Sequence, residues 1–344
     1  MKKFNVGVMG ATGAVGQEMI KVLGERNFPV GELRCLASAR SEGKVLSTPF
    51  GDVTVQKTCV TAFDGLDIVL GASENDIAEA MAPHIKAAGA VFVDNSSAFR
   101  MDPEVPLVVP EINPEDVEWN KGIISNPNCS TIITLVAVNA INKLSEIKAM
   151  YASTYQATSG AGAAGPVEMY EESEAILKAR AAGGKGNSYG ADIQPKVFQH
   201  QIAFNLIPQI GGFGGNLYTS EEMKLQNEGR KIMHLPDMKV SCTCVRVPVE
   251  RSHAISACVI TEDRLELDDV RRAISEAAGA KLYDDGDARV YPLPILTSNQ
   301  DIVDVGRIRR DLVNENGIIL WCCGDQVRKG AATNAVQIAE LLTK

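Results

Sequence analysis

The stretch GATGAVG at residues 10–16 constrains the fold most, because of what lies on either side of it. An apolar run at 4–9 precedes it, and a segment with apolar residues at helical spacing begins near Ala14. A strand, a glycine-rich turn and a helix, in this order, open a parallel dinucleotide-binding sheet. Gly10 would allow the tight turn, Gly13 a close approach to a pyrophosphate, and Gly16 tight packing of the helix on the strand.

Short apolar runs continue this alternation through the first third of the chain. The pattern predicts strands at 33–37, 66–72, 91–94, 106–109 and 123–125, with helices at about 76–88 and 130–144. Pro83 is expected to kink the first of these helices. Strands that alternate with helices indicate right-handed βαβ units and a mostly parallel sheet.

The pattern changes after the helix at 130–144. Longer alternating strands are predicted at 151–159, 239–249 and 252–263, with helices at about 163–181, 219–233 and 267–277. The stretch 181–192 indicates a glycine-rich surface loop, and a final helix within 329–344 is expected to return to the first domain. We therefore expect an α/β protein. A Rossmann-type dinucleotide-binding domain would comprise 1–128 and 328–344, and a second α+β domain, catalytic and dimerising, would comprise 129–327.

Composition excludes several classes of function. Lys and Arg total 34 against 43 Asp and Glu, and the net charge of −9 argues against nucleic acid or an anionic membrane as the main partner. No apolar run approaches the roughly 20 residues needed to span a bilayer, and the N-terminus leads directly into a strand, so no signal peptide is expected. Eight cysteines without a CxxC motif, and four scattered histidines, indicate reduced thiols in a cytoplasm and no metal site.

Cys129 stands in SNPNCSTI (125–132), after an Asn-Pro-Asn turn and before the helix. A helix N-terminus stabilises a thiolate, which would lower the thiol pKa and make the sulfur nucleophilic. The Cys129 N–H and the Asn128 amide could polarise an attacked carbonyl. A small buried cysteine is the alternative. Together with the dinucleotide turn, the site suggests an aldehyde-level dehydrogenase that works through a thioester.

The end of the second strand bears on the choice of cofactor. An NAD site needs an acid there for the ribose 2′-hydroxyl, but the segment LASARSEGK (36–44) offers Ser38, Arg40 and Ser41 instead. A cation and hydroxyls suit a 2′-phosphate, so we expect NADP(H). The alternative is that Arg40 is an exposed residue of a surface loop and does not contact the cofactor.

Eight separated motifs together resemble the aspartate-semialdehyde dehydrogenase family from end to end. They are GATGAVG, DNSSAFR (94–100), PLVVPEIN (106–113), SNPNCSTI, STYQATSGAG (153–162), EEMK (221–224), CVRVPVERSHA (244–254) and GDQVRKGAATNAVQIAE (324–340). The resemblance implies NADPH-dependent reductive dephosphorylation of L-aspartyl 4-phosphate to L-aspartate 4-semialdehyde and phosphate, in the biosynthesis of lysine, methionine, threonine, isoleucine and diaminopimelate. It also implies a homodimer through the second domain, or a dimer of such dimers.

The resemblance also implies a role for each matching residue. Cys129 would attack the acyl phosphate, His253 would relay protons, and Gln156 would orient the substrate. Arg246 would bind the α-carboxylate and Glu221 the ammonium, while Asn128, Arg100 and Lys224 would hold the phosphate. The cofactor contacts would be Gly10, Thr12, Gly13, Ala14, Val15, Gly16, Ser38, Arg40, Ser41, Ser73, Asn95, Ser159, Gly160 and Gln326.

Plainer interpretations stand beside several of these roles. His253 could be structural, and Lys224 could form an i,i+3 ion pair with Glu221. Two antiparallel strands joined at PVERS could bring Arg246 and His253 into one cleft. Cys322 and Cys323 are interpreted as small buried residues of a strand.

Two rival functions are compatible with the chain. An N-acetyl-glutamyl-phosphate reductase runs the same thioester chemistry, but Glu221 suits a free ammonium and favours the aspartyl substrate. A catalytically silent NADP-binding paralogue would be expected to lack Cys129, His253, Arg246 or Gln156, and all four are present.

Overall fold

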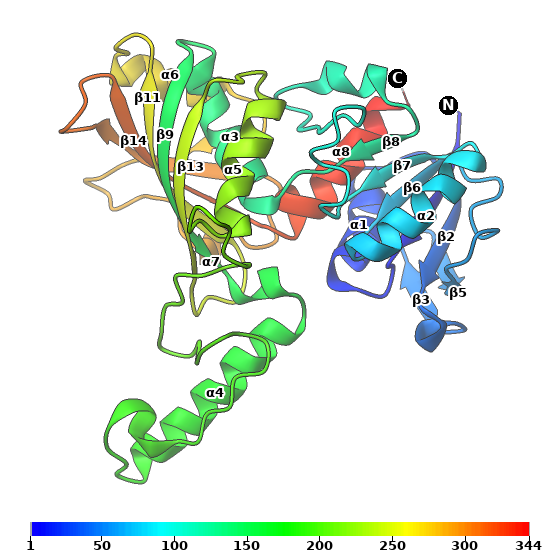
Figure 1. Cartoon of the computed structure of the whole chain (residues 1–344), viewed down its shortest axis with the longest axis horizontal. Helices are drawn as coiled ribbons and strands as arrows, with labels where there is room; N and C mark the ends of the chain where they lie inside the picture. The colour runs from blue at the N-terminus through cyan, green and yellow to red at the C-terminus, as the bar shows by residue number, and fades with distance from the viewer. Residues whose placement is uncertain (1, 344) are drawn as a thin grey trace.

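The computed structural model describes residues 2–343 and contains two six-stranded sheets, which lie side by side in Figure 1. The first is parallel, in the order β5-β2-β1-β6-β7-β8. Its strands are β1 (Phe4–Met9), β2 (Val30–Ala37), β5 (Gln56–Lys57), β6 (Ile68–Gly71), β7 (Val91–Asp94) and β8 (Ile123–Ser125). The predicted Rossmann-type sheet is confirmed.

Helices cover both faces of this sheet. The apolar cluster on one face includes residues of α1 (Ala14–Glu25) and α8 (Thr333–Leu341), and the cluster on the other includes residues of α2 (Asn75–Ala87). The strands are apolar along most of their length because neither face meets water. Pro83 lies inside α2.

One predicted strand of this domain is wrong. Residues 106–109 run beside β8 but make only an isolated bridge, between Leu107 and Ser125. The side chain of Asn113 accepts the Val109 N–H at 2.9 Å and donates to the Leu107 carbonyl at 2.9 Å, so these groups are not available to a ladder. A small hairpin that the sequence did not predict, β3 (Val45–Thr48) with β4 (Gly51–Thr54), follows β2.

The second sheet is mixed, in the order β10-β9-β11-β14-β13-β12. Its strands are β9 (Ile147–Gln156), β10 (Lys239–Arg246), β11 (His253–Thr261), β12 (Ala280–Leu282), β13 (Val303–Arg310) and β14 (Gly317–Gly324). The core on one face includes residues of α3 (Cys129–Asn142), α5 (Ser220–Ile232) and α6 (Leu267–Glu276). Cys322 and Cys323 are buried residues of β14, as predicted.

The strands on either side of PVERS run antiparallel, as expected, but they are not neighbours in the sheet. β10 pairs with β9 in parallel, and β11 pairs with β9 antiparallel, so β9 lies between them. The chain direction still reverses between β10 and β11, because it turns back in residues 247–252. The last residues of β10 and the first residues of β11 therefore lie at the same end of the strands, with the last residues of β9 between them.

Helix α4 (Ala164–Ala181) projects away from both sheets (Figure 1). Its buried acids fix the chain that returns beside it: Glu168 accepts the N–H groups of residues 196–198, and Glu172 accepts those of residues 202 and 203. The remaining short elements are α7 (Pro294–Thr297), η1 (Ala39–Ser41), η2 (Pro114–Trp119), η3 (Thr158–Ala161), η4 (Asn187–Gly190) and a π-helical turn, η5 (Arg328–Ala332).

The chain crosses between the two sheets twice. It enters the second core along α3 and returns through η5 to α8, whose Ala335, Val336 and Ile338 pack in the first core. The expected return of the last helix is therefore confirmed, while a division of the chain at residues 128 and 328 stays a prediction. None of the helices in residues 2–343 is long and apolar enough to cross a membrane.

Candidate active site

Cys129 is the first residue of α3. Asn128 caps the helix, because its Oδ1 accepts the N–H of Ser130 at 3.1 Å and that of Thr131 at 3.2 Å. The N–H of a first helical residue has no acceptor within its own helix. Cys129 therefore presents its thiol and a backbone donor at the same helix end.

The lowered thiol pKa expected at this position is not found in the resting site. Although Cys129 keeps partial exposure, burial raises its pKa to about 11, and the charge of Glu221 adds to the rise. Lys224, Arg100 and Arg246 act in the opposite direction. Loss of water and a nearby anion outweigh these three cations, so the resting thiol is protonated at neutral pH.

Glu221 of α5 is the anionic centre of the site. Its Oε1 accepts from Asn128 Nδ2 at 3.0 Å and from Gln156 Nε2 at 3.1 Å, and its Oε2 lies 2.9 Å from Lys224 Nζ. Burial alone would raise the pKa of Glu221, but Lys224 and the two amide donors bring it down to about 2. The plainer interpretation of Lys224 is thus partly right: it pairs with Glu221, but against a buried carboxylate rather than in solvent.

Three site residues stand in a row across the second sheet. Arg246 is the register partner of Gln156 at the ends of β10 and β9. Ala254 pairs with Tyr155, which sets His253, the first residue of β11, level with Gln156 on the other side. Strand pairing alone therefore brings together residues that are 90 and 97 positions apart in the chain, counting from Gln156.

His253 is fully buried, and its ring has a defined tautomer. The Ala157 N–H donates to Nδ1 at 3.0 Å, so in the neutral ring the proton lies on Nε2. Nε2 has no protein partner among the described residues. Burial, and then the charge of Arg246, lower the pKa of His253 to about 3. In this state His253 is a hydrogen-bond donor, and a proton-accepting role at Nε2 would require the loss of the Ala157 contact.

Glycines let the backbone approach these groups. A Cβ on Gly160 would lie 2.8 Å from Arg246 Nη1 and 3.0 Å from His253 Cε1. A Cβ on Gly330 would lie 2.9 Å from the Cβ of Cys129. Arg246 is further held by its hydrogen bond to the Ala157 carbonyl, at 2.7 Å. Both glycines therefore belong to the packing of the site, and sequence reasoning identified only Gly160.

Arg100 extends the site toward the first sheet. Its Nε donates to the Asn126 carbonyl at 3.0 Å, its Nη2 to the Asn95 carbonyl at 2.9 Å, and its Nη1 to Glu228 at 3.1 Å. Sequence reasoning missed Glu228. The signal that could have found it is its position seven residues after Glu221, on the same face of α5.

Most of the predicted cofactor residues lie at the carboxyl ends of β1, β2 and β6, while Asn95 follows β7, Ser159 and Gly160 lie in η3, and Gln326 follows β14. Gly10 has φ +86°, and a Cβ there would lie 2.2 Å from the Ala72 carbonyl oxygen, so only glycine fits this turn. Thr12, Gly13, Ala14, Val15 and Gly16 follow in the turn and the first turn of α1. Ser73 Oγ, just beyond β6, is buried without a protein partner, which suits a polar ligand in this cradle.

The end of β2 carries the residues expected to select the cofactor. Ser38 and Arg40 are exposed, while Ser41 is buried with its Oγ 3.5 Å from Thr12 Oγ1. Arg40 lies in η1 and makes no ion pair among the described residues. These side chains are free to meet a ligand phosphate.

A cleft of about 360 Å³ lies between α1 and the second domain and is lined by Ala14, Gln17, Ser159 and Arg251, among others. Gln326 lies behind this lining, in the chain before η5, where its Nε2 donates to Ser159 Oγ and its Oε1 accepts the Ser252 N–H. Asn95 lies farther from it, with its Oδ1 accepting from Asn126. The cleft thus joins the glycine turn to the residues around Gly160, as a bound dinucleotide requires.

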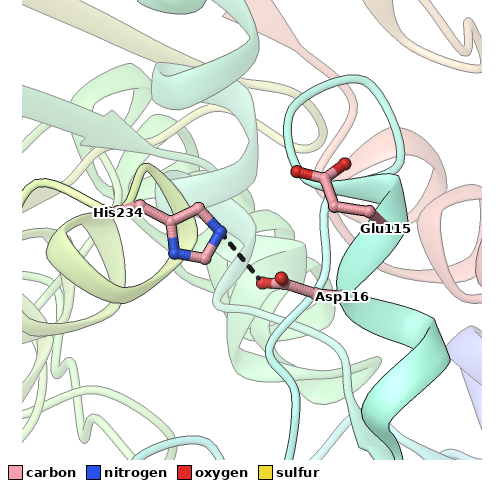
Figure 2. Close-up of side chains that lie close together, drawn as sticks. All are labelled: Glu115, Asp116 and His234. Atoms are coloured by element: carbon pink, nitrogen blue, oxygen red, sulfur yellow. Dashed lines mark ion pairs between the residues drawn. The ribbon is translucent and has the colours of Figure 1, made fainter.

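One cluster outside this site has metal-ligating side chains. Glu115, Asp116 and His234 bring their ligand atoms within 4.8 Å of one another, the single such group found within residues 2–343 (Figure 2). Asp116 is already occupied, because it accepts hydrogen bonds from Asn113 at 2.6 Å and from Trp119 at 3.3 Å, and its Oδ2 lies 3.3 Å from His234 Nε2. Glu115 and His234 are exposed, so we interpret the group as a polar contact between η2 and the end of α5.

Comparisons with known proteins bear on both halves of the chain. Residues 5–120 match the family model "Semialdehyde dehydrogenase, NAD binding domain", and residues 138–329 match "Semialdehyde dehydrogenase, dimerisation domain". The chain is 46% identical to the aspartate-semialdehyde dehydrogenase of Synechocystis sp. over 341 residues, covering 98% of this chain and 97% of the relative. It is 43% identical to that of Bacillus subtilis over 348 residues, covering 99% and 97%. The crystal structure of aspartate semialdehyde dehydrogenase II from Vibrio cholerae superposes with a TM-score of 0.92 at 42% identity, covering 99% of both chains.

Proposed function

Because the chain belongs to the aspartate-semialdehyde dehydrogenase family, we propose that it reduces L-aspartyl 4-phosphate to L-aspartate 4-semialdehyde and phosphate through a thioester on Cys129. The comparisons confirm the resemblance drawn from the sequence motifs. The reaction would supply lysine, methionine, threonine, isoleucine and diaminopimelate biosynthesis, in the cytoplasm.

One observation carries the proposal: a single acid and three cations surround the thiol of Cys129. Glu221, Lys224, Arg100 and Arg246 all act electrostatically on that sulfur. The proposed substrate has an ammonium, a carboxylate and a phosphate, which are one cation and two anionic groups. Glu221 would bind the ammonium, and the planar guanidinium of Arg246 would bind the carboxylate. Arg100 and Lys224 would bind the phosphate.

The first step is acyl transfer to sulfur. Cys129 attacks the acyl carbon, the carbon–oxygen bond to phosphate breaks, and the thiol proton leaves with the phosphate. This balance suits the resting geometry, because the thiol is protonated and neither ring nitrogen of neutral His253 has a free lone pair. The Cys129 N–H and the Nε2–H of His253 are the donors available to the carbonyl oxygen.

The second step reduces the thioester. When bound in the cleft, the nicotinamide supplies the hydride. Oxygen then bears negative charge, which the Nε2–H of His253 stabilises, and collapse of the tetrahedral adduct releases the aldehyde and the Cys129 thiolate. The thiolate regains a proton from solvent. His253 therefore acts mainly as a fixed hydrogen-bond donor. In this scheme it does not carry a proton between sulfur and substrate, as a proton relay would.

The NAD-binding family model supports a dinucleotide, and we propose NADP(H) as the preferred one. Exposed Arg40 and Ser38 suit a 2′-phosphate at the end of β2. Arg40→Asp should raise the KM for NADP at least tenfold and leave the KM for NAD nearly unchanged. An unaltered preference would reject the assignment.

The function is tested with the purified protein in the reverse direction. Aspartate semialdehyde should reduce NADP only when phosphate is present, and Cys129→Ala should abolish this activity. Acyl phosphates of aspartate and of N-acetylglutamate, compared in the forward direction, test the main rival. Preference for the acetylated substrate would reject our proposal, and so would phosphate-independent turnover.

We also propose a homodimer formed through the outer face of the second sheet. The dimerisation family model matches this domain, and Tyr151 is exposed on that face, where the ring centroids of Tyr155 and Trp321 also lie 5.3 Å apart. Sedimentation equilibrium should give twice the mass of one chain, or four times if two dimers associate. A Tyr151→Asp variant should shift the equilibrium toward monomer.

A further inference from the structure

Glu228 is a buried acid that the steps above do not use. It lies on α5 and is 2% exposed. Its Oε2 accepts the backbone N–H of Asn128 at 2.7 Å, and its Oε1 accepts from Arg100 Nη1 at 3.1 Å. One carboxylate thus holds two groups that border the sulfur from different segments of the chain.

The bonds of Arg100 show what this contact fixes. A guanidinium has five N–H donors. Those directed to Asn126, Asn95 and Glu228 use one hydrogen each on Nε, Nη2 and Nη1. One hydrogen on each terminal nitrogen is left for a ligand. Of the three acceptors only Glu228 is charged, so it is the strongest of the contacts that set the plane of the guanidinium.

The second carboxylate oxygen of Glu228, which accepts the Asn128 N–H, links the Arg100 guanidinium to the segment that carries Cys129. Asn128 directly precedes Cys129 and caps its helix. A hydrogen bond to the Asn128 N–H therefore holds the turn that carries the Cys129 sulfur. A rigid carboxylate shared between Asn128 and Arg100 sets the distance from the phosphate subsite to the sulfur. Geometry of this kind matters, because misplacement by about 1 Å can cost about 100-fold in rate.

A carboxylate this close to an anion subsite also has an electrostatic effect of the opposite sign. If Glu228 were only a counter-ion for Arg100, its neutralisation would strengthen phosphate binding. If it sets the position of Arg100, the same change would weaken phosphate binding. The two roles therefore predict changes in opposite directions.

We propose that Glu228 is a positioning residue that holds the phosphate-binding guanidinium of Arg100 in register with the Cys129 turn. This inference rests on the proposed function, in which Arg100 binds phosphate.

The test is Glu228→Gln, assayed as phosphate-dependent reduction of NADP by aspartate semialdehyde. Glutamine has the same length but replaces one acceptor with a donor, which must face either Arg100 or the Asn128 N–H. We expect the KM for phosphate to rise at least tenfold, with the KM for NADP changed less than twofold. An unchanged or lowered KM for phosphate would overturn the proposal.

Glu222→Gln is the matched control. Glu222 is a buried acid on the same helix, and its oxygens accept the N–H groups of Thr219 at 2.7 Å and Cys244 at 3.1 Å, away from Arg100. It should lose stability as Glu228→Gln does but keep the wild-type KM for phosphate. An equal rise in both variants would show a general loss of stability and would contradict a positioning role.

Glu228→Asp distinguishes the effect of the carboxylate charge from the effect of side-chain length. It also tests the proposal if the Glu228→Gln variant does not fold. It keeps the charge but is one methylene too short to hold both partners, so the KM for phosphate should rise by a smaller factor, about threefold to fivefold. A wild-type value in Glu228→Asp would reject the inference. Wild-type protein without phosphate-dependent turnover would instead reject the proposed function itself.

Discussion

At the residue scale, the eight cysteines share one side chain but have different surroundings. Burial raises the pKa of Cys322 to about 12 within an apolar core, while exposed Cys59 beside Thr61 has a lowered pKa. The surroundings of Cys129 differ from both, because burial and an acid raise its pKa while three cations lower it. Its reactivity therefore depends on what enters the site.

The raised pKa of Cys129 predicts the pH dependence of its alkylation. The resting thiol ionises only as pH approaches about 11, so thiolate content, and with it the rate, should rise about tenfold per pH unit from pH 7 to 10. Iodoacetamide labelling of Cys129, followed by peptide mass spectrometry in a Cys59→Ser background, measures this rate. A plateau below pH 8 would show that the helix N-terminus prevails after all, and Cys129→Ser supplies the blank.

Gly160 offers a second test at this scale. A methyl group there must displace Arg246 or His253, which lie 2.8 and 3.0 Å from its Cβ position. Gly160→Ala should lower kcat/KM by about 100-fold, as expected for a 1 Å displacement of positioned groups, while the melting temperature changes little. Gly212→Ala is the control, because a Cβ there meets nothing within 4 Å. Equal kcat/KM values in the two variants would contradict the close packing.

At the scale of elements, α5 does the most to assemble the site. Its residues 221, 224, 228 and 231 carry alternating charge along one face. Lys231 extends this row to the first domain, where its Nζ donates to the carbonyls of Arg100, Asp102 and Val105 at 2.7 to 2.8 Å. A shift of this helix would therefore move both the substrate contacts and the Arg100 loop.

The start of α5 predicts how firmly that helix is held. Thr219 and Glu222 form a capping box, in which each side chain bonds the other residue's backbone N–H. Thr219→Ala should lower the free energy of unfolding by about 1 to 2 kcal/mol, as for other lost caps, measured by urea denaturation. Ser220→Ala changes an exposed neighbour and should have almost no effect. A Thr219→Ala protein as stable as wild type would argue against the cap.

At the scale of the whole molecule, ion pairs join the two domains away from the thiol. Arg328 contacts Glu18 at 2.9 Å and Glu25 at 2.5 Å, both on α1, and Asp301 of the second domain at 2.8 Å. Its hydrogen bonds to Asp301 raise the pKa of Arg328, so it stays charged. Lys329 beside it is fully buried and pairs with Glu111 at 2.7 Å.

Removal of Arg328 should loosen this junction. Arg328→Ala removes the ion-pair partner of Asp301, while Glu18 keeps longer contacts to Lys21 and Arg251 and Glu25 keeps one to Lys21. Since Glu25 and Asp301 are also partly exposed, we expect a loss of about 2 kcal/mol, below the 3 to 5 kcal/mol of a fully buried pair. Arg26→Ala breaks only a surface pair with Glu340 and should cost about 0.5 kcal/mol. Thermal unfolding compares the two. Equal losses would show that Arg328 adds no more than a surface pair does.

The amino-acid sequence alone predicted most of the strands and helices up to residue 277, the glycine turn and the position of Cys129 at a helix start, but not the β3–β4 hairpin or strands β12 and β13. The predicted features are local properties, since apolar spacing and φ preferences depend on neighbours in the chain. The motifs also identified Arg100, Gln156, Glu221, Lys224, Arg246 and His253 as members of one site, although a contact among them could not be derived from spacing.

How those residues meet depends on long-range contacts that appear first in the folded chain. The tertiary structure placed β9 between β10 and β11, left 106–109 outside the ladder, fixed the His253 tautomer through Ala157 and reversed the expected direction of the Cys129 pKa. It also revealed Glu228, whose two partners lie 100 and 128 residues away. Each of these depends on long-range pairing and on the removal of water, which no local pattern of residues encodes.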